Sequence, residues 1–229
     1  MKEIFNVEKL LDIFNYIFWF LLLNILFMVF NLPLIFFILS VGINHISEYF
    51  PLFLLCLIPF APSLTVLIYC MGKIIKYKDL NLFKDLFNGL KINFKQSFLL
   101  WCGELALVFI LYTNIKFFSS VQNGKPFIFL FTSFLIILFL VTPYIYLLIS
   151  RFSMKSFDLI KSSIILTFTR PILTLSNAII IIIPLILFEF NPGTVILFIS
   201  SILAFLMSFS NKSLLEELEV SAAKTSCNS

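Results

Sequence analysis

The sequence contains few charged residues: 12% of its 229 residues are Asp, Glu, Lys or Arg, whereas 61% are hydrophobic. An ordinary globular domain is about 25% charged, because it must cover its core with groups that water solvates. A chain with about half that share has too little polar surface to face water. The main solvent is therefore expected to be lipid, and the fold class an all-α bundle of transmembrane helices.

Motifs for catalysis and cofactor binding are also missing. There is no Walker loop, no Gly-x-Ser-x-Gly elbow, no His-Glu-x-x-His pair and no Gly-x-Gly-x-x-Gly turn. The single histidine, His45, lacks Cys or acidic residues at metal-binding spacing. The four cysteines include no Cys-x-x-Cys pair, so no disulfide framework is expected. We therefore expect a non-enzymatic protein without a cofactor or a metal.

Long apolar runs recur about six times, and in hydrocarbon each should be a helix that satisfies its own backbone hydrogen bonds. Pro33 and Pro143 should bend two of these helices or start shorter segments, and Pro171 suits the first turn of the fifth. The spans form one domain over residues 1–210, followed by a short cytoplasmic tail, 211–229. They are expected near residues 14–39, 50–72, 97–116, 126–150, 172–188 and 194–210.

The basic residues are sorted by side of the membrane. All of the 16 Lys and Arg residues except Lys116 and Lys125 fall in the N-terminal flank, the loops 73–96 and 151–170, and the tail. This asymmetry is the positive-inside pattern, so both termini should be cytoplasmic. Because the charges are divided in this way rather than gathered in one patch, the net charge of +4 does not indicate a nucleic-acid partner.

Each of the two cytoplasmic loops predicts an amphipathic helix that lies in the membrane interface. The apolar stripe of the first is Phe83, Leu86, Phe87, Leu90 and Phe94. Its polar side is Lys84, Asp85, Asn88, Lys91 and Lys95, with Asn81 or Asp79 as N-cap. The second loop sets Phe157, Ile160, Ile164 and Phe168 against Lys155, Asp158, Lys161 and Ser162, and ends at Arg170. These helices either dock a cytoplasmic partner or anchor the bundle to the lipid bilayer.

The two loops can be superposed at a constant offset, which sets Phe83 on Phe157 and Phe94 on Phe168. The match indicates a parallel duplication of a helix–loop–helix unit, as some transporter folds show. Alternatively, any two amphipathic loops match at helical period.

Glu104 is the candidate functional acid within the membrane. It lies about 10 Å into the third span at 1.5 Å per residue, where a carboxylate must be protonated, face the bundle interior or find a partner. It either contacts a substrate or a proton, or forms a hydrogen bond between helices. The neighbouring Gly103 should permit close helix packing. The expected partners of Glu104 are Tyr69, Asn24, Asn31 and Lys73.

A set of short motifs lies between residues 24 and 101. They are Asn24-Ile25-Leu26, Leu32-Pro33, Pro62-Ser63-Leu64 and Asn93-Phe94-Lys95-Gln96-Ser97. This stretch resembles the YesL-like family of bacterial membrane proteins, which share a Pro-small-Leu element at the start of helix 2 and an Asn-Phe-Lys-Gln-Ser element before helix 3. The chain departs from the family's Gly-Pro-Ala-type sequence at Ala61-Pro62-Ser63, which indicates a divergent member or a neighbour.

The resemblance implies a six-helix protein of the bacterial plasma membrane for which no catalytic residues are established. Family members tend to be encoded beside carbohydrate uptake systems, which implies an accessory or regulatory role with a carbohydrate ABC transporter as partner. One alternative is that the chain is itself a transport subunit, an ABC-type permease or a small autonomous transporter. The loop at residues 161–163 lacks the acid and glycine of an ABC coupling helix. Another alternative is a membrane-embedded enzyme that uses Glu104.

Overall fold

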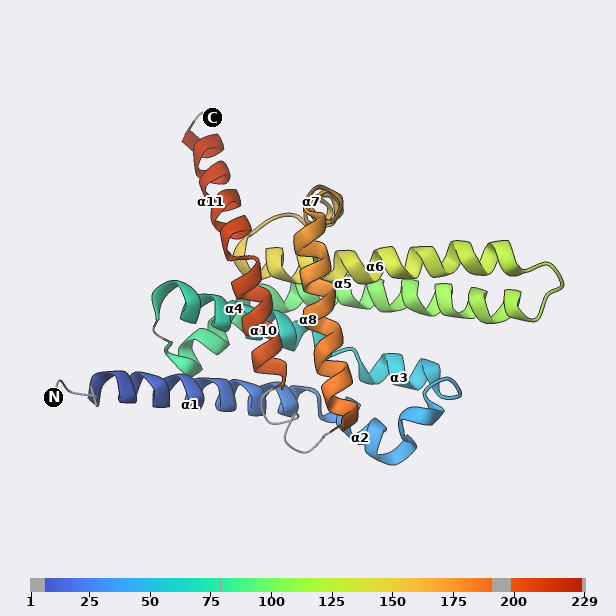
Figure 1. Cartoon of the computed structure of the whole chain (residues 1–229), viewed down its shortest axis with the longest axis horizontal. Coiled ribbons are helices and arrows are strands. Elements are labelled where there is room, and N and C mark those ends of the chain that lie inside the picture. Colours follow the sequence, from blue (N-terminus) through green and yellow to red (C-terminus); the bar gives the residue numbers. More distant parts are fainter. Residues whose placement is uncertain (1–6, 79, 191–198, 228–229) are drawn as a thin grey trace.

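A computed structural model of the chain describes residues 7–78, 80–190 and 199–227, and its elements are helices throughout this part (Figure 1). No strand occurs among the described residues, so the predicted all-α class is confirmed. The helices are α1 (Val7–Phe30), α2 (Leu32–Val41), the short 3-10 helix η1 (Ile43–His45), α3 (Phe50–Cys56), α4 (Phe60–Tyr77), α5 (Leu82–Ser119), α6 (Lys125–Arg151), α7 (Ser156–Thr169), α8 (Pro171–Phe190), α10 (Ile199–Ser210) and α11 (Lys212–Cys227).

Several of these helices are long and apolar enough to cross a membrane. Within the described residues, three segments meet this criterion individually: Phe50–Tyr77, which comprises α3 and α4, Leu82–Ser119, which is α5, and Lys125–Arg151, which is α6. Two bent pairs meet it together, α1 with α2 at 68° and α7 with α8 at 102°, so the number of spans reaches five if each pair counts as one. About six were predicted. The sixth, near 194–210, lies partly outside the described residues, and its described part is the short apolar helix α10.

The prolines act largely as predicted. The first span breaks at Asn31, and α2 restarts with Pro33 in its first turn, where a missing N–H removes no helical hydrogen bond. Pro171 begins α8 in the same way. Pro143 does not break its helix, because α6 is continuous from Lys125 to Arg151.

The first predicted interfacial helix is not a separate element. Residues 82–96 are helical, but they continue without a break into the third span as the 38-residue helix α5. At 1.5 Å per residue this helix is about 57 Å long, whereas the hydrocarbon layer is about 30 Å thick. One part of α5 must therefore extend beyond the hydrocarbon. The predicted tail also contains a helix that was not identified from the sequence, α11, which runs from Lys212 to Cys227.

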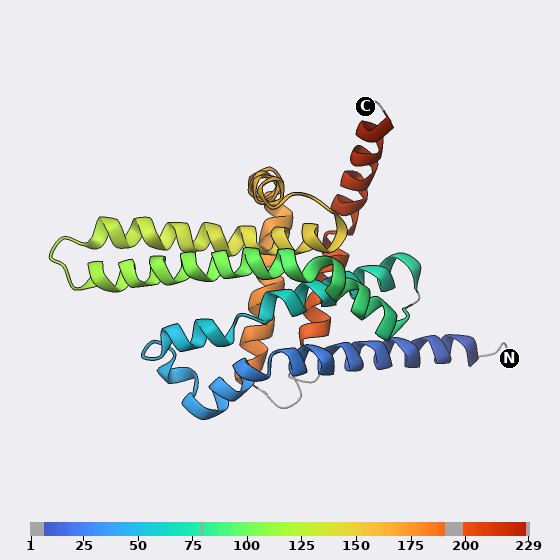
Figure 2. The same cartoon turned by 180° about the vertical axis from the view of Figure 1, so that it is seen from behind.

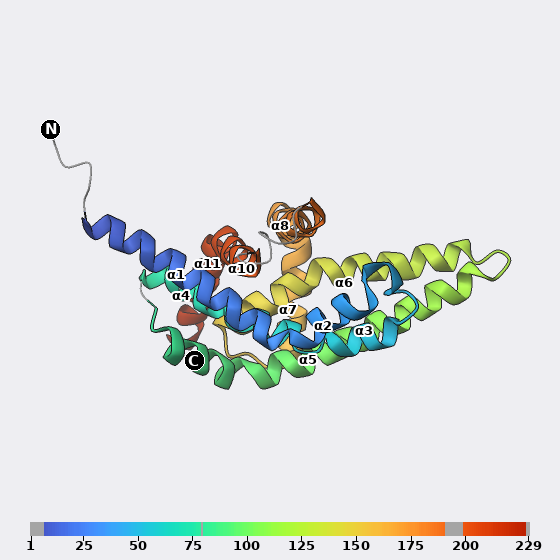
Figure 3. The ribbon, with the colours of Figure 1, turned by 90° about the horizontal axis from the view of Figure 1, so that it is seen from below.

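The helices run in two main directions. α5 and α6 form an antiparallel hairpin that extends beyond the rest of the molecule, and α1 and α4 lie roughly along it (Figures 1 and 2). α8 and α10 cross these helices and are seen nearly end-on in Figure 3. The core is centred on α4, which packs against α1, α5, α6 and α10. Cys70 and Met71 of α4 are fully buried, as are Tyr146 and Leu147 near the end of α6.

The element boundaries repeat at the offset seen in the sequence. α4 ends at Tyr77 and α6 at Arg151, and α5 begins at Leu82 and α7 at Ser156, so both pairs lie 74 positions apart. The units differ at the next step, because α5 continues through Ser97 whereas the second unit bends by 102° before Pro171. A duplicated unit and a coincidence of helical period both remain compatible with these boundaries.

Gly89 and Gly103, both on α5, give a matched pair of tests. A Cβ on Gly89 would lie 2.9 Å from Cδ1 of Tyr69 on α4, whereas a Cβ on Gly103 would have no atom within 4 Å. The close approach that was predicted at Gly103 is therefore found at Gly89. Gly89→Ala should lower the free energy of unfolding by about 1–3 kcal/mol relative to Gly103→Ala, because the added methyl displaces the Tyr69 ring.

Thermal unfolding of both variants in the same detergent would measure this difference. Alanine adds helix propensity in both variants, so this contribution cancels. Equal midpoints for the two variants would show that α4 and α5 do not pack as described.

Candidate functional site

Glu104 faces α6 in the hairpin and is 93% buried, since its relative exposure is 7%. Its Oε2 accepts a hydrogen bond of 3.2 Å from the Thr142 hydroxyl. The same hydroxyl lies 2.8 Å from the Leu138 carbonyl oxygen, one turn earlier in α6. A hydroxyl has one proton to donate, so it cannot fully serve both acceptors. Thr142 therefore satisfies the Glu104 carboxyl only in part.

The aromatic side chains of Tyr146 and Trp101 lie on the other side of the Glu104 carboxyl. The Tyr146 hydroxyl lies close enough to Glu104 for the two groups to interact, but the pair does not reach hydrogen-bonding geometry. The Tyr146 ring meets the Trp101 ring edge-on, with centroids 6.0 Å apart. Trp101 is fixed by donating its indole N–H to the Leu57 carbonyl at 2.7 Å. Among the described residues, neither Oε1 of Glu104 nor the Tyr146 hydroxyl has a hydrogen-bond partner.

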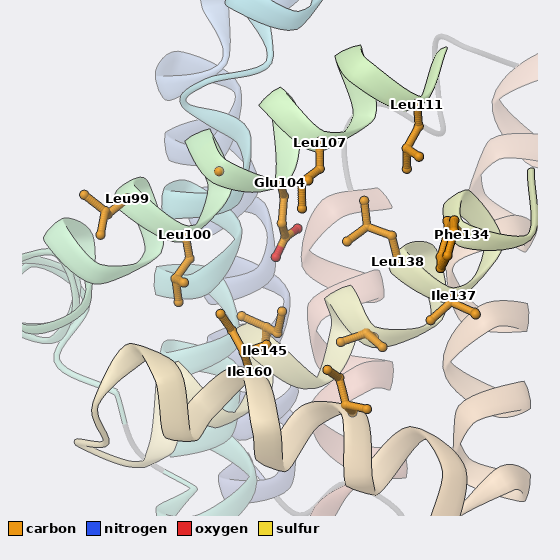
Figure 4. A pocket seen from close by; sticks show the side chains of 13 residues that line it. Leu99, Leu100, Glu104, Leu107, Leu111, Phe134, Ile137, Leu138, Ile145 and Ile160 are labelled. Carbon is orange, nitrogen blue, oxygen red and sulfur yellow. The ribbon is translucent and has the colours of Figure 1, made fainter. Parts of the chain in front are cut away.

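Two cavities meet at Glu104. The first has a volume of about 630 Å³ and lies between α5, α6 and α7, where Figure 4 shows the Glu104 carboxyl pointing into it. The second, of about 270 Å³, lies between α4, α5, α6, α8 and α10. Glu104 is the one ionisable acid in either lining, and most other lining residues are aliphatic or aromatic. A carboxyl group between two apolar cavities is thus the main chemical feature of this region.

None of the four expected partners contacts Glu104 in the described structure. Lys73 forms an ion pair with Asp85, Asn31 donates to the Ser63 hydroxyl, and Asn24 accepts from the backbone N–H of Ser200. Tyr69 instead packs beside Gly89. The error has a simple cause: all four candidates were sought in the first two spans or directly after them, whereas Glu104 turns toward the fourth span.

Thr142 and Tyr146 were missed, although the sequence contains a usable signal. Two spans joined by a short turn run antiparallel, so residues at equal distances from the turn lie opposite each other. Glu104 and Thr142 are equally far from Asn123 in the α5–α6 turn. Tyr146 is one helical turn beyond Thr142 and shares its face.

The six candidate loop residues of α5 are all exposed, and the face that packs against the bundle was not identified from the sequence. Phe83, Phe87 and Phe94 are exposed, as are Lys84, Lys91 and Lys95. The side packed against the bundle is made of small or polar residues together with Leu86. Asp85 was assigned to the polar outer side, yet it is buried, and Lys73 donates to it at 2.7 Å. The buried small and polar residues are Asp85, Gly89, Asn93 and Ser97.

α7 shows the same arrangement. Its buried positions are Leu159, Ser163 and Thr167, whereas Phe157, Phe168 and Lys161 are exposed. Ile160 and Ile164, predicted as part of the apolar stripe, line the first cavity beside Glu104. α7, the second predicted interfacial helix, therefore forms one wall of the candidate site.

The last candidate, Arg170, is already paired within the chain. Its guanidinium donates to both carboxylate oxygens of Glu217 on α11, at 2.9 and 2.8 Å. Glu219, also on α11, accepts from Lys76 at 2.8 Å and lies 3.5 Å from Arg151. The tail therefore joins the ends of α4 and α6 to the α7–α8 bend.

The remaining candidates for metal or redox chemistry lie apart. His45 is exposed, and its Nδ1 is 3.3 Å from Glu48 Oε2. The described residues contain no group of three His, Cys, Asp or Glu side chains that could hold a metal ion. Cys56, Cys70 and Cys102 are free thiols, and Cys227 has no described side chain.

Comparison with known proteins gives one match. A family described as "Protein of unknown function, DUF624" matches residues 20–115, which run from α1 through most of α5 and include Glu104. No curated protein and no solved structure matches the chain. Together with the long apolar helices, this match defines an α-helical membrane protein in which residues 20–115 are similar to a family of unknown function.

The ion pairs of α11 predict how the tail is held. Replacing both Glu217 and Glu219 with Gln removes its charged contacts with Arg170, Lys76 and Arg151. These side chains are partly exposed, and each such pair contributes about 0.2–1 kcal/mol. Trypsin should therefore cleave the double variant after Lys212 at least about threefold faster than the unaltered protein, because three such pairs are lost.

Glu216→Gln is the matched control, because Glu216 contacts Lys212 of the same helix at 3.9 Å. High salt should accelerate cleavage of the unaltered protein toward the rate of the double variant, since salt screens exposed charges. A double variant that is cleaved at the control's rate would show that the charges do not hold α11.

Proposed function

We propose that the chain is a divergent YesL-like protein that serves as an accessory or regulatory subunit for carbohydrate transport. DUF624 is the domain family that YesL-like proteins carry, and its match over residues 20–115 covers the stretch 24–101, where the motifs of the resemblance lie. The expected partner is a carbohydrate ABC transporter, and the expected activity is non-enzymatic.

The observation that carries the proposal is an exposed aromatic and basic surface with a rigid support. Phe83 and Phe87 are 69% and 67% exposed on α5, while Asp85, midway between them on the opposite side of the helix, is buried and paired with Lys73. Gln96 of α5 donates to the Met154 carbonyl at 2.8 Å, which ties this helix to the segment before α7. Aromatic side chains on a fixed scaffold lose little entropy when a partner covers them. The surface therefore suits docking to another membrane protein.

The ion pairs of α11 support the predicted orientation, in which both termini lie in the cytoplasm of a bacterial cell. The segments assigned to the cytoplasmic side by their charges are joined through Glu217 and Glu219, which contact Arg170, Lys76 and Arg151. The α5–α6 turn, flanked by Lys116 and Lys125, lies at the far end of the hairpin (Figure 1). Segments on one side of a membrane can meet in this way, whereas segments on opposite sides cannot.

The main alternative is that the chain transports a solute itself. Sugar recognition needs several convergent hydrogen-bonding groups. The two cavities offer chiefly aliphatic and aromatic walls, with Glu104, Thr142 and Tyr146 as their main polar groups. A sugar permease is therefore less well supported than an accessory role. A membrane-embedded enzyme that uses Glu104 is a further alternative, and the buried carboxyl is the observation that favours it.

Affinity purification of the tagged chain from native membranes would test the accessory role. We expect a carbohydrate transporter permease or ATPase to co-purify under gentle detergent. Replacing Phe83 and Phe87 with Ala should reduce its recovery about tenfold or more, because buried aromatic anchors dominate such interfaces.

The matched control replaces with Ala two phenylalanines near the α5–α6 turn that are exposed to a similar degree, Phe117 at 63% and Phe129 at 76%. Immunoblots of the membrane fraction would verify equal amounts of each variant. Recovery of the chain without any transporter component would contradict the proposal, and equal losses in both double variants would assign Phe83 and Phe87 to lipid contact.

A further inference from the structure

The Glu104 carboxyl has an unusual electrostatic position. It is 93% buried, and Oε1 lacks a hydrogen-bond partner in the described structure. No Lys or Arg lines either cavity, so no protein cation stands beside the carboxyl there. Burial without a cation favours the neutral form of a carboxyl group, but the ionised form would attract a positive charge strongly, because the low dielectric constant weakens a Coulomb attraction very little.

The second cavity adds aromatic faces to this carboxyl. Its walls include the rings of Phe60, Trp101, Phe139 and Tyr146. The Trp101 ring lies between those of Phe60 and Tyr146, with centroids 6.2 and 6.0 Å away. Aromatic faces attract organic cations, and Trp does so most strongly. A site in which a carboxyl group lies next to several aromatic rings is suited to bind a large, weakly hydrated cation.

The first cavity is large enough to hold a small molecule and offers a path by which it can enter. Its volume of about 630 Å³ falls within the range of about 300–1,000 Å³ that small-molecule sites have. Several of its lining side chains are also exposed on the outer face of the hairpin, which would face lipid: Leu99, Leu107, Phe134 and Ile137. A ligand dissolved in the bilayer could therefore enter between α5 and α6.

We infer that the two cavities around Glu104 bind a lipophilic organic cation, with its charge beside the carboxyl and its apolar groups against the aliphatic and aromatic walls. The Glu104 carboxyl already points into the first cavity, and a small rotation of its side chain would expose Oε1, which protein atoms cover. A lipid acyl chain fits the same walls but does not need a carboxyl, and an anion is repelled. This site is independent of the accessory role proposed above.

Tetraphenylphosphonium and tetraphenylborate test the charge requirement, because the two ions have nearly the same size and shape and opposite charge. Their binding would be measured with purified protein in lipid nanodiscs, using Trp101 fluorescence in a Trp19→Phe background, which leaves Trp101 as the one tryptophan. We expect saturable quenching by tetraphenylphosphonium and none by tetraphenylborate. Glu104→Gln should weaken the binding at least about tenfold while the thermal midpoint stays within a few degrees.

Glu48→Gln, which alters an exposed acid in the loop after α2, is the matched control and should bind as the unaltered chain does. Glu104→Asp keeps the charge and should retain part of the affinity. Equal quenching by both ions, or unchanged affinity in Glu104→Gln, would overturn the inference and assign the cavities to lipid chains. Absence of saturable binding to the unaltered protein would overturn it as well.

Discussion

Polar contacts between neighbouring helices hold this structure together, because lipid competes with the apolar side chains that would otherwise drive packing. Asn177 of α8 and Asn211, between α10 and α11, are fully buried and exchange side-chain hydrogen bonds. The hydroxyl oxygens of Tyr144 and Thr174, 3.1 Å apart, join α6 to α8. The Ser201 hydroxyl donates to the Phe20 carbonyl and joins α10 to α1. Each contact is directional and specifies one register. The crossing of α8 and α10 over the other helices depends on these contacts.

The ionic contacts are arranged differently. Lys76, Arg151 and Arg170 come from separate parts of the chain, and two acids of α11, Glu217 and Glu219, bring them together. Arg151 also lies over the backbone of α4, where its guanidinium donates to the Gly72 carbonyl at 3.3 Å. This end of the bundle therefore carries most of the charge pairs in the described structure, whereas the α5–α6 hairpin is chiefly apolar. A bilayer imposes this separation of charged from apolar residues, because the charged groups require contact with water and the apolar ones are stable in hydrocarbon.

Sequence patterns predicted the helical class, the break at Pro33 and the start of α8 at Pro171, because these depend on local backbone chemistry. They failed on the buried face of α5. The amphipathic interpretation set the phenylalanines toward the membrane interface and Asp85 on the polar side, so it did not identify the small and polar residues that pack against the bundle. Where lipid is the solvent, large apolar side chains can face outward, and small or polar ones allow helices to approach and to form hydrogen bonds. Tertiary pairing, such as that of Glu104 with Thr142, depends on which helices become neighbours, and hydropathy does not contain that information.

Glu104 differs from the other buried polar groups in what it leaves unsatisfied. Asn31 Oδ1, Asn93 Nδ2 and Ser163 Oγ also lack a partner in the described structure, but none of these residues borders the two cavities, whereas the unpartnered Tyr146 hydroxyl lies beside Glu104 in the second cavity. They are neutral, so each costs about 1–3 kcal/mol at most. A side chain that serves only to join two helices is expected to be saturated by its partner, as in the Asn177–Asn211 pair. The Glu104 carboxyl competes with the Leu138 carbonyl for the single proton of the Thr142 hydroxyl, and it borders an apolar cavity. This arrangement leaves the carboxyl able to interact with a positively charged ligand.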